Sequence, residues 1–233
     1  SGTVATGADY FGGGYTPNTA TVDKFAFPTD NRTTLGTGLS AARQALAGAA
    51  NSGTAGYFGG GYEGSAVATV DKFAFSDDSR TTLSTGLSAA RYYLAAMANS
   101  GTAGYFGGGY EASYVATVDK FAFSDDSRTT LGTGLSATRY YLAGMANSGT
   151  AGYFGGGEAA AYVATVDKFA FSDDSRTTLG TGLSSTRRLL AGMANSGTAG
   201  YFGGGITDTV QSTVDKFAFS DDSRTTLSTG LSA

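Results

Sequence analysis

Apolar and polar residues follow one pattern that recurs along the whole chain. In the copy at residues 91–130, the apolar stretch "RYYLAAMA" ends at the turn-forming cluster "NSGT". The stretch "AGYF" follows and runs into three glycines. "ATVDKFAF" fits a strand whose side chains alternate between two faces, with Asp119, Phe121 and Phe123 on one and Val118, Lys120 and Ala122 on the other. The turn-forming "SDDS" comes next, and the β-branched "RTTLGT" completes the copy. The pattern predicts four short β-strands per copy.

One segment of this copy also fits a helix. "SAARYYLAAMAN" is rich in Ala, Leu and Arg, which favour helices. It has no cap signature, however, and it stands between turn clusters in a unit that otherwise favours strands. We therefore expect a strand here and keep the helix as the alternative.

The repeat has a fixed length. "TVDKF" begins at Thr21, Thr69, Thr117, Thr165 and Thr213, a step of 48 residues each time. Residues 69–116 and 117–164 differ at six of 48 positions. The head and the tail of the chain together make a further unit, so the sequence contains five units, one of them cut. Such an array shares its core between neighbouring units, and we expect residues 1–233 to form a single domain.

Units of this size and strand content are typical of propeller blades. The sequence predicts an all-β fold, a five-bladed β-propeller whose blades are four-stranded antiparallel sheets. We expect each blade to begin with its innermost strand, with "SGTVAT" as a stunted inner strand in the first blade. We also expect the ring to be closed. The glycine triplets fit a bend where the blades crowd together.

The unit resembles the kelch repeat. The resemblance rests on the double glycine after an aromatic strand (Tyr105 to Gly108), on the strand "DKFAF", and on Leu87 and Arg91 four residues apart. The third turn, from Ser76 to Leu83, has a weaker similarity to the Asp-box of sialidase-type propellers. Both resemblances imply a propeller fold, and neither implies an activity.

Composition narrows the chemistry. The chain has no His and no Cys, so His- or Cys-based catalytic triads and His- or Cys-ligated metal sites cannot form. Asp77 and Asp78 are calcium candidates, but "SDDSR" lacks the spacing of calcium loops, and we expect these residues to stabilise turns. Because near-identical units offer few different roles, we expect the protein to be no enzyme and to need no cofactor. We expect Asp71, Lys72 and their copies to form ion pairs with Arg between blades.

The copies differ mainly at two places, the stretch after the glycines and the stretch after "GLS". Elsewhere there are some Ala/Gly and Ser/Gly exchanges, Ala49 in place of Met, and "PTDN" in place of "SDDS" in the first unit. In an up-and-down meander both places fall on the same face of the propeller. Loops on a rigid scaffold usually carry binding function, and Tyr and Arg dominate recognition sites. We therefore predict a binding face at these residues, around the mouth of the central channel: Tyr92, Tyr93, Tyr110, Glu111, Tyr114, Tyr140, Tyr141 and Arg188.

Two functions fit the sequence. The first is a non-catalytic, lectin-like or adhesin-like propeller that binds a glycan or a protein on one face. The second is a structural protein, recently amplified or engineered, with no ligand. The net charge of −4 is spread over the repeats, and no apolar run is long enough to span a membrane. We therefore expect no nucleic-acid partner and no membrane insertion, and we expect a monomer or a part of a larger assembly.

Overall fold

The structure is a computed structural model, which describes residues 7–27, 29–195 and 197–232. Every regular element in these ranges is a β-strand. The strands are β1 (Gly7–Gly12), β2 (Val22–Phe27), β3 (Asn31–Thr34), β4 (Ala47–Asn51), β5 (Ala55–Gly59), β6 (Val70–Ala74), β7 (Arg80–Thr82), β8 (Ala95–Asn99), β9 (Ala103–Gly107), β10 (Val118–Ala122), β11 (Arg128–Thr130), β12 (Ala143–Asn147), β13 (Ala151–Gly155), β14 (Val166–Ala170), β15 (Arg176–Thr178), β16 (Ala191–Asn195), β17 (Ala199–Gly203), β18 (Val214–Ala218) and β19 (Arg224–Thr226).

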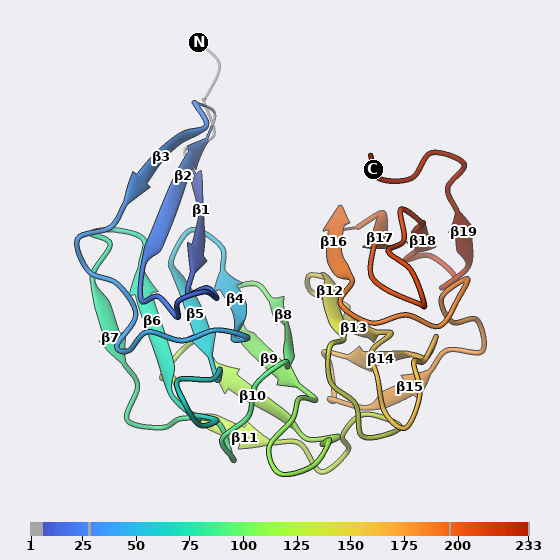
Figure 1. Ribbon diagram of the computed structural model, residues 1–233, viewed down its shortest axis with the longest axis horizontal. Coiled ribbons are helices and arrows are strands. Elements are labelled where there is room, and N and C mark those ends of the chain that lie inside the picture. The colour runs from blue at the N-terminus through green and yellow to red at the C-terminus, as the bar shows by residue number, and fades with distance from the viewer. Residues whose placement is uncertain (1–6, 28, 196, 233) are drawn as a thin grey trace.

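These strands form five antiparallel sheets in chain order, which are the blades of a propeller (Figure 1). We number the blades one to five along the chain. Blades two to five each have four strands, whereas blade one has the three strands β1, β2 and β3 in the described part of the chain. The predicted fold class, a five-bladed propeller with a 48-residue repeat, is therefore confirmed. The inner strand predicted at "SGTVAT" lies outside the described residues.

The expected strand is confirmed in the segment for which a helix was the alternative. Residues 95–99 form β8 and pair with β9 from Ala95 opposite Gly107 to Asn99 opposite Ala103. The strand begins later than the apolar stretch at Arg91 predicts, because Tyr93 has a positive φ of 55° and turns the chain. Residues with positive φ do not continue a strand.

The core lies between adjacent blades. Phe106 of blade three is fully buried and packs on Gly59 of blade two, where an added β-carbon would lie 2.8 Å from the phenyl ring. Only glycine therefore fits at this position without a shift of the ring. The same pair recurs as Phe154 on Gly107 and as Phe202 on Gly155. Close approach between blades is thus one reason for the repeated glycines.

The segment that links two blades is clamped by a buried ion pair. The guanidinium of Arg91 lies 2.9 Å from the carboxylate of Asp119, and both side chains are almost fully buried. Ser88 donates two further hydrogen bonds to Asp119, from its backbone N–H and from its hydroxyl, each 2.9 Å long. A buried carboxylate needs such partners, and here the link supplies them.

The prediction that the Asp–Lys pairs bind Arg between blades was right for the aspartate and wrong for the lysine. Asp71 pairs with Arg43 of the link at 2.9 Å. Lys72 instead reaches the neighbouring blade and pairs with Asp126 at 2.8 Å. The reason is strand alternation, which points Asp71 and Lys72 to opposite faces of the sheet.

The ring is open, contrary to the expected closed ring. Blade one and blade five stand at the two ends of an arc (Figure 1). Phe11 of blade one is 62% exposed and Met193 of blade five is 70% exposed, whereas Phe106 and Met145 inside the arc are 0% and 3% exposed. The inner strand β16 has no strand of blade one opposite it in the described residues, in contrast to the packed pairs β4 with β8, β8 with β12 and β12 with β16.

Candidate ligand-binding surface

The link arginines place the predicted tyrosines. Arg91 is held by Asp119 and also donates a 3.1 Å hydrogen bond to the carbonyl of Phe106. The chain leaves this anchor through Tyr92 and Tyr93 before β8 begins. Arg139 is anchored in the same way at Asp167 and precedes Tyr140 and Tyr141. The tyrosines therefore stand on segments whose starting points are fixed in the core.

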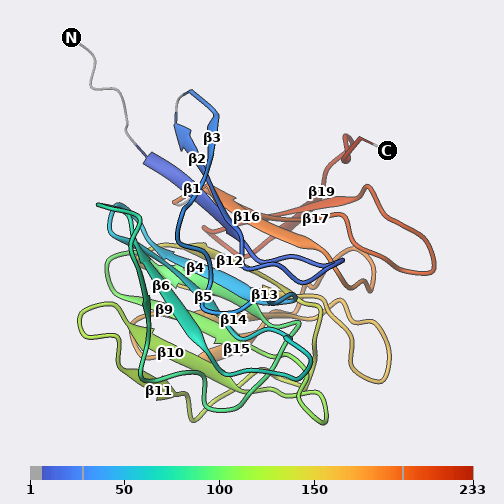
Figure 2. The ribbon, with the colours of Figure 1, turned by 60° about the vertical axis from the view of Figure 1, so that its left-hand side comes forward.

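The two variable stretches meet on one face. The N–H of Tyr92 donates to the carbonyl of Tyr110 at 3.1 Å, and the N–H of Tyr110 donates back at 2.9 Å. Tyr110 in turn pairs with Tyr114 across its own loop. Because the link and the loop after the glycines are bonded together, the residues that differ between copies form one continuous surface. Figure 2 shows the blades edge-on, with these loops at the same end of successive blades.

The predicted tyrosines form one aromatic cluster that runs from blade to blade. The rings of Tyr114 and Tyr140 are stacked, with centroids 4.8 Å apart and planes at 7°. Tyr93 and Tyr141 are 4.0 Å apart, and Tyr92 and Tyr110 are 5.5 Å apart. The tyrosine side chains are half-buried, because they pack on one another and keep an outer edge in solvent. Such a surface offers flat apolar area together with hydroxyl groups.

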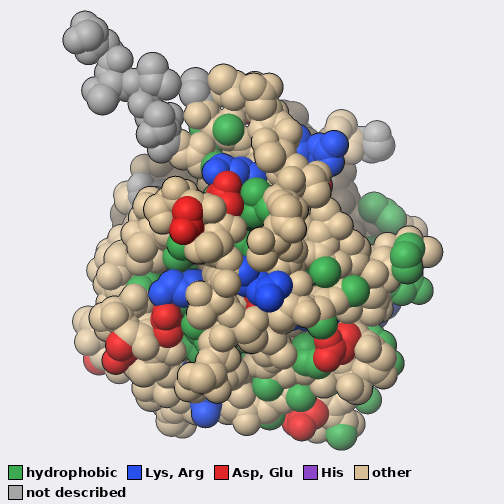
Figure 3. All heavy atoms as spheres, turned by 90° about the vertical axis from the view of Figure 1, so that its left-hand side faces the viewer, with side chains coloured by type: hydrophobic (Ala, Val, Ile, Leu, Met, Phe, Trp, Pro, Cys, Tyr) green, Lys and Arg blue, Asp and Glu red, His purple; other side chains and the backbone are tan. Residues whose placement is uncertain are grey.

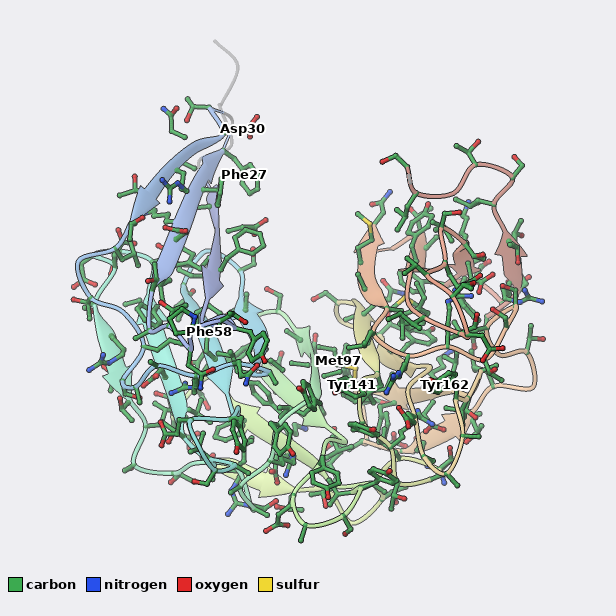
Figure 4. The ribbon with its side chains drawn as sticks, in the orientation of Figure 1. Phe27, Asp30, Phe58, Met97, Tyr141 and Tyr162 are labelled. Carbon is green, nitrogen blue, oxygen red and sulfur yellow. The ribbon has the colours of Figure 1, made fainter. Side chains whose placement is uncertain are left out.

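The inner side of this cluster lines the mouth of the central channel. A cavity of about 210 Å³ is lined there by residues from four successive links, among them Ala45, Tyr93, Tyr141 and Leu189. All four have φ between 55° and 57°. Their backbones form a ladder, in which the N–H groups of Tyr93, Tyr141 and Leu189 each donate to the carbonyl of the equivalent residue in the preceding link at 2.9 Å. Left-handed backbone at non-glycine residues costs energy, and it is typical of sites where position matters. Tyr141 lies near the inner strands, whereas Tyr162 lies farther out (Figure 4).

One end of the cluster is charged. Arg188 donates a 2.5 Å hydrogen bond to Glu158 and lies over the rings of Tyr141 and Tyr162, at 5.3 and 5.0 Å from their centroids. Burial, together with the nearby Glu158 carboxylate, raises the pKa of Tyr140 to about 12. The hydroxyl of Tyr140 is therefore a neutral hydrogen-bonding group at physiological pH. Glu111 is exposed at the rim of the surface.

The structure adds three residues that the predicted set did not contain: Tyr62, Glu158 and Tyr162. Tyr62 lies 5.2 Å from Tyr92, ring to ring, and the other two contact Arg188. The signal that could have found them is register. Tyr62 and Glu158 occupy the position of Tyr110 in their copies, and Tyr162 occupies the position of Tyr114.

The acidic turns on the opposite face serve the fold. The side chain of Asp77 accepts the N–H of Ser79 at 3.0 Å, as expected for a turn. Asp78 accepts hydrogen bonds from Lys24 and Tyr10 of the preceding blade. Within the described ranges there is no group of three acidic residues that could hold a metal ion. Acidic and basic side chains are interspersed on the side of the ring shown in Figure 3.

No known family model and no curated protein matches this chain. In the ranges that the structure describes, no helix could cross a membrane.

Proposed function

We propose that this protein is a non-catalytic binding propeller. The observation that supports the proposal is the tyrosine cluster, because its side chains gather on the one face where otherwise near-identical copies differ. The ligand is a glycan or a protein, bound across neighbouring blades. Aromatic rings can stack on a sugar face or an apolar side chain, and the tyrosine hydroxyls and Arg188 supply polar contacts.

The lectin-like or adhesin-like role follows from repetition. Several similar sites on one scaffold gain affinity together even when each of them is weak. The sites are unequal, since blade two begins with Gln44 and Ala45, and blade five begins with Arg188 and Leu189. The kelch and Asp-box resemblances belong to this proposal as a hypothesis about which propellers the chain is related to, and they imply no activity. The absence of His and Cys supports a role without catalysis.

The chain supplies a matched substitution for the test. Gln44 and Ala45 occupy the positions of Tyr92 and Tyr93, and Ala45 adopts the same left-handed φ. A variant with Tyr92→Gln, Tyr93→Ala, Tyr140→Gln and Tyr141→Ala therefore removes four rings while keeping residues that this backbone already accepts.

The experiment screens the protein against a glycan array and then measures binding of the variant to the glycans found. We expect binding to fall at least tenfold while the thermal transition stays within a few degrees. A Thr102→Ala variant on the opposite face is the control, with binding unchanged. If the four-ring variant unfolds, the tyrosines are packing groups and the structural alternative is favoured. If it binds undiminished, the ligand site lies elsewhere.

A further inference from the structure

One aspartate in each blade pairs with arginine, and the aspartate of blade one has fewer partners than the others. Asp71 of blade two pairs with two arginines, Arg43 of the preceding link at 2.9 Å and Arg80 of the outer strand at 3.9 Å. Asp23 of blade one pairs with Arg32 of its outer strand and, in the described part of the chain, with no link arginine. The pairing with two arginines recurs in the other three blades, at Asp119, Asp167 and Asp215.

The carboxylate of Asp23 is able to accept a second guanidinium. One of its oxygens accepts a 2.5 Å hydrogen bond from Thr34, and Arg32 reaches both oxygens only at 3.4 Å. The side chain of Asp23 is 27% exposed, whereas that of Asp71 is fully buried under its link. Residues 1–6 and the single residues outside the described ranges include no Lys or Arg, so no side chain among them can act as the second arginine.

Blade five carries the groups that hold the backbone of a link arginine. Inside the arc, the N–H of Arg91 donates to the carbonyl of Val67 at 3.1 Å, and the carbonyl of Arg91 accepts the N–H of Gly61 at 3.0 Å. The equivalent groups of blade five are the carbonyl of Gln211 and the N–H of Gly205, and neither has such a partner among the described residues. Backbone groups of this kind bind strongly to another peptide backbone.

Beside these groups there is also space for a leucine. An added β-carbon on Gly60 of blade two would be crowded by the following link, with the carbonyl of Arg91 at 2.5 Å and Leu94 at 3.1 Å. On the equivalent Gly204 of blade five, the nearest atom would belong to Leu231, at 3.2 Å, and neither an arginine nor a second leucine lies within 4 Å. Leu231 is 53% exposed, whereas its counterpart in blade two is 5% exposed. Blade five therefore presents an apolar contact for one more side chain.

We propose that the opening of the arc binds an extended segment of a partner protein with the pattern R-x-x-L. The guanidinium of the segment pairs with the carboxylate of Asp23, its arginine backbone bonds to Gly205 and Gln211, and its leucine covers Leu231. These two sets of residues lie on blades one and five, at the two sides of the opening (Figure 1). The bound segment therefore joins the two blades as a link joins blades inside the arc.

The pattern comes from the chain itself. All four links read R-x-x-L, from Arg43, Arg91, Arg139 and Arg187. The negative charge of Asp23 favours an arginine, which forms strong charge-assisted hydrogen bonds with carboxylates. A second copy of this chain does not fit as the partner, because its four link arginines are buried. The site is separate from the tyrosine cluster and does not depend on the function proposed for that cluster.

The test uses the whole chain and a fluorescent, end-capped peptide with the sequence of residues 42–47, ARQALA. This link sequence contains no tyrosine that could stack on the tyrosine cluster. We expect saturable one-to-one binding by fluorescence anisotropy. A peptide with citrulline in place of arginine keeps the shape without the charge and should bind at least tenfold more weakly, the effect of a charged hydrogen bond. N-acetylarginine amide, which lacks the leucine, should bind more weakly than the peptide.

Two protein variants locate the site. Asp23→Asn should weaken binding about tenfold, and its thermal transition should stay within a few degrees of the parent because Asp23 is partly exposed. Glu63→Gln removes a charge from an exposed loop of blade two and should bind the peptide like the parent chain. New hydrogen-exchange protection at Gly205 should accompany binding.

The proposal is overturned if the peptide does not bind, or if the citrulline peptide binds as well as the arginine peptide. It is also overturned if Asp23→Asn binds like the parent, or if Glu63→Gln loses as much affinity as Asp23→Asn, because the attraction would then not be specific to Asp23. Equal affinity for N-acetylarginine amide and for the peptide would likewise overturn it, since the site would then recognise a side chain and not a protein segment.

Discussion

The interfaces inside the arc and the two faces at its opening are built from the same residues and differ in what they touch. Between blades two and three, Tyr57 and Lys72 reach Asp126, and Phe123 stacks on Tyr57 at 5.0 Å. The arrangement recurs three more times, at Tyr10, Tyr105 and Tyr153. At the opening its members are separated. Blade five carries Tyr201 and Lys216, while blade one carries Phe27 and Asp30 (Figure 4).

The comparison teaches that burial here is a property of the neighbour and not of the residue. Met145 and Met193 lie in strands of identical sequence, yet one is 3% exposed and the other 70%. The difference follows from position in the array, because each blade covers the next. One residue at the opening also departs from the repeat. Asp9 occupies the position of Gly152, against which the thioether of Met97 packs. A carboxylate at this place does not accept a methionine side chain as glycine does.

The largest contrast should come from removing an aromatic ring. Phe106→Ala deletes a fully buried ring from an interface and should lower the free energy of unfolding by about 4 kcal/mol. Phe11→Ala removes the equivalent ring from the open face, where it is mostly exposed, and should cost less than about 0.5 kcal/mol. Urea unfolding of the two variants measures this. Equal losses would mean that the opening is closed in solution.

The repeat made the fold predictable, and the same repeat hid the opening. Strand alternation and turn clusters located the strands in every blade, and the positions of variation located the tyrosine surface. Apart from Asp9, the faces of blades one and five carry the residues of an interface, so most of their sequence favours closure as it does for the other pairs of blades. The left-handed backbone at Tyr93 was also invisible, because Ala, Tyr and Leu all occupy this position and none of them favours positive φ. The partner of Lys72 lies 54 residues along the chain, beyond any local pattern.

The second contrast concerns the buried carboxylates. Asp119→Ala leaves the guanidinium of Arg91 buried without its partner and should lower the free energy of unfolding by about 3 kcal/mol. The equivalent Asp23 of blade one pairs with Arg32 at 3.4 Å, and both side chains are partly exposed, so Asp23→Ala should cost less than about 1 kcal/mol. Chemical denaturation at neutral pH compares them. A similar loss for both would show that Asp23 is buried in solution.

The same carboxylates predict how stability changes with pH. Burial alone would raise the pKa of Asp119, but the hydrogen bond from Thr130, the charge of Arg91 and the bonds from Ser88 together lower it below the usual 3.8. A lowered folded-state pKa adds stability that is present above pH 3.8 and is lost as the pH falls through the folded value. We expect the free energy of unfolding to drop in this acidic range, with a smaller drop in Asp119→Asn than in the parent chain. An unchanged acid slope in Asp119→Asn would assign the drop to other groups.

The smallest contrast isolates one hydroxyl. Tyr105 donates a 2.7 Å hydrogen bond to Asp174 of the next blade, and Tyr105→Phe removes this bond while it keeps the ring that stacks on Phe171. The expected loss is about 1 kcal/mol. Tyr201→Phe makes the same change at the opening, where no described residue accepts the hydroxyl, and should change stability by less than about 0.5 kcal/mol.

Burial, followed by the bond to Asp174, raises the pKa of Tyr105 above the ordinary value of 10.0. A raised folded-state pKa means that this stability is complete below pH 10 and is lost as the pH rises through the folded value, so the difference between Tyr105→Phe and the parent should narrow under alkali. Thermal unfolding of both variants at pH 7 and above pH 10 measures these effects, and a loss in Tyr201→Phe as large as that in Tyr105→Phe would mean that Tyr201 has found its acceptor, Asp30, across a closed ring.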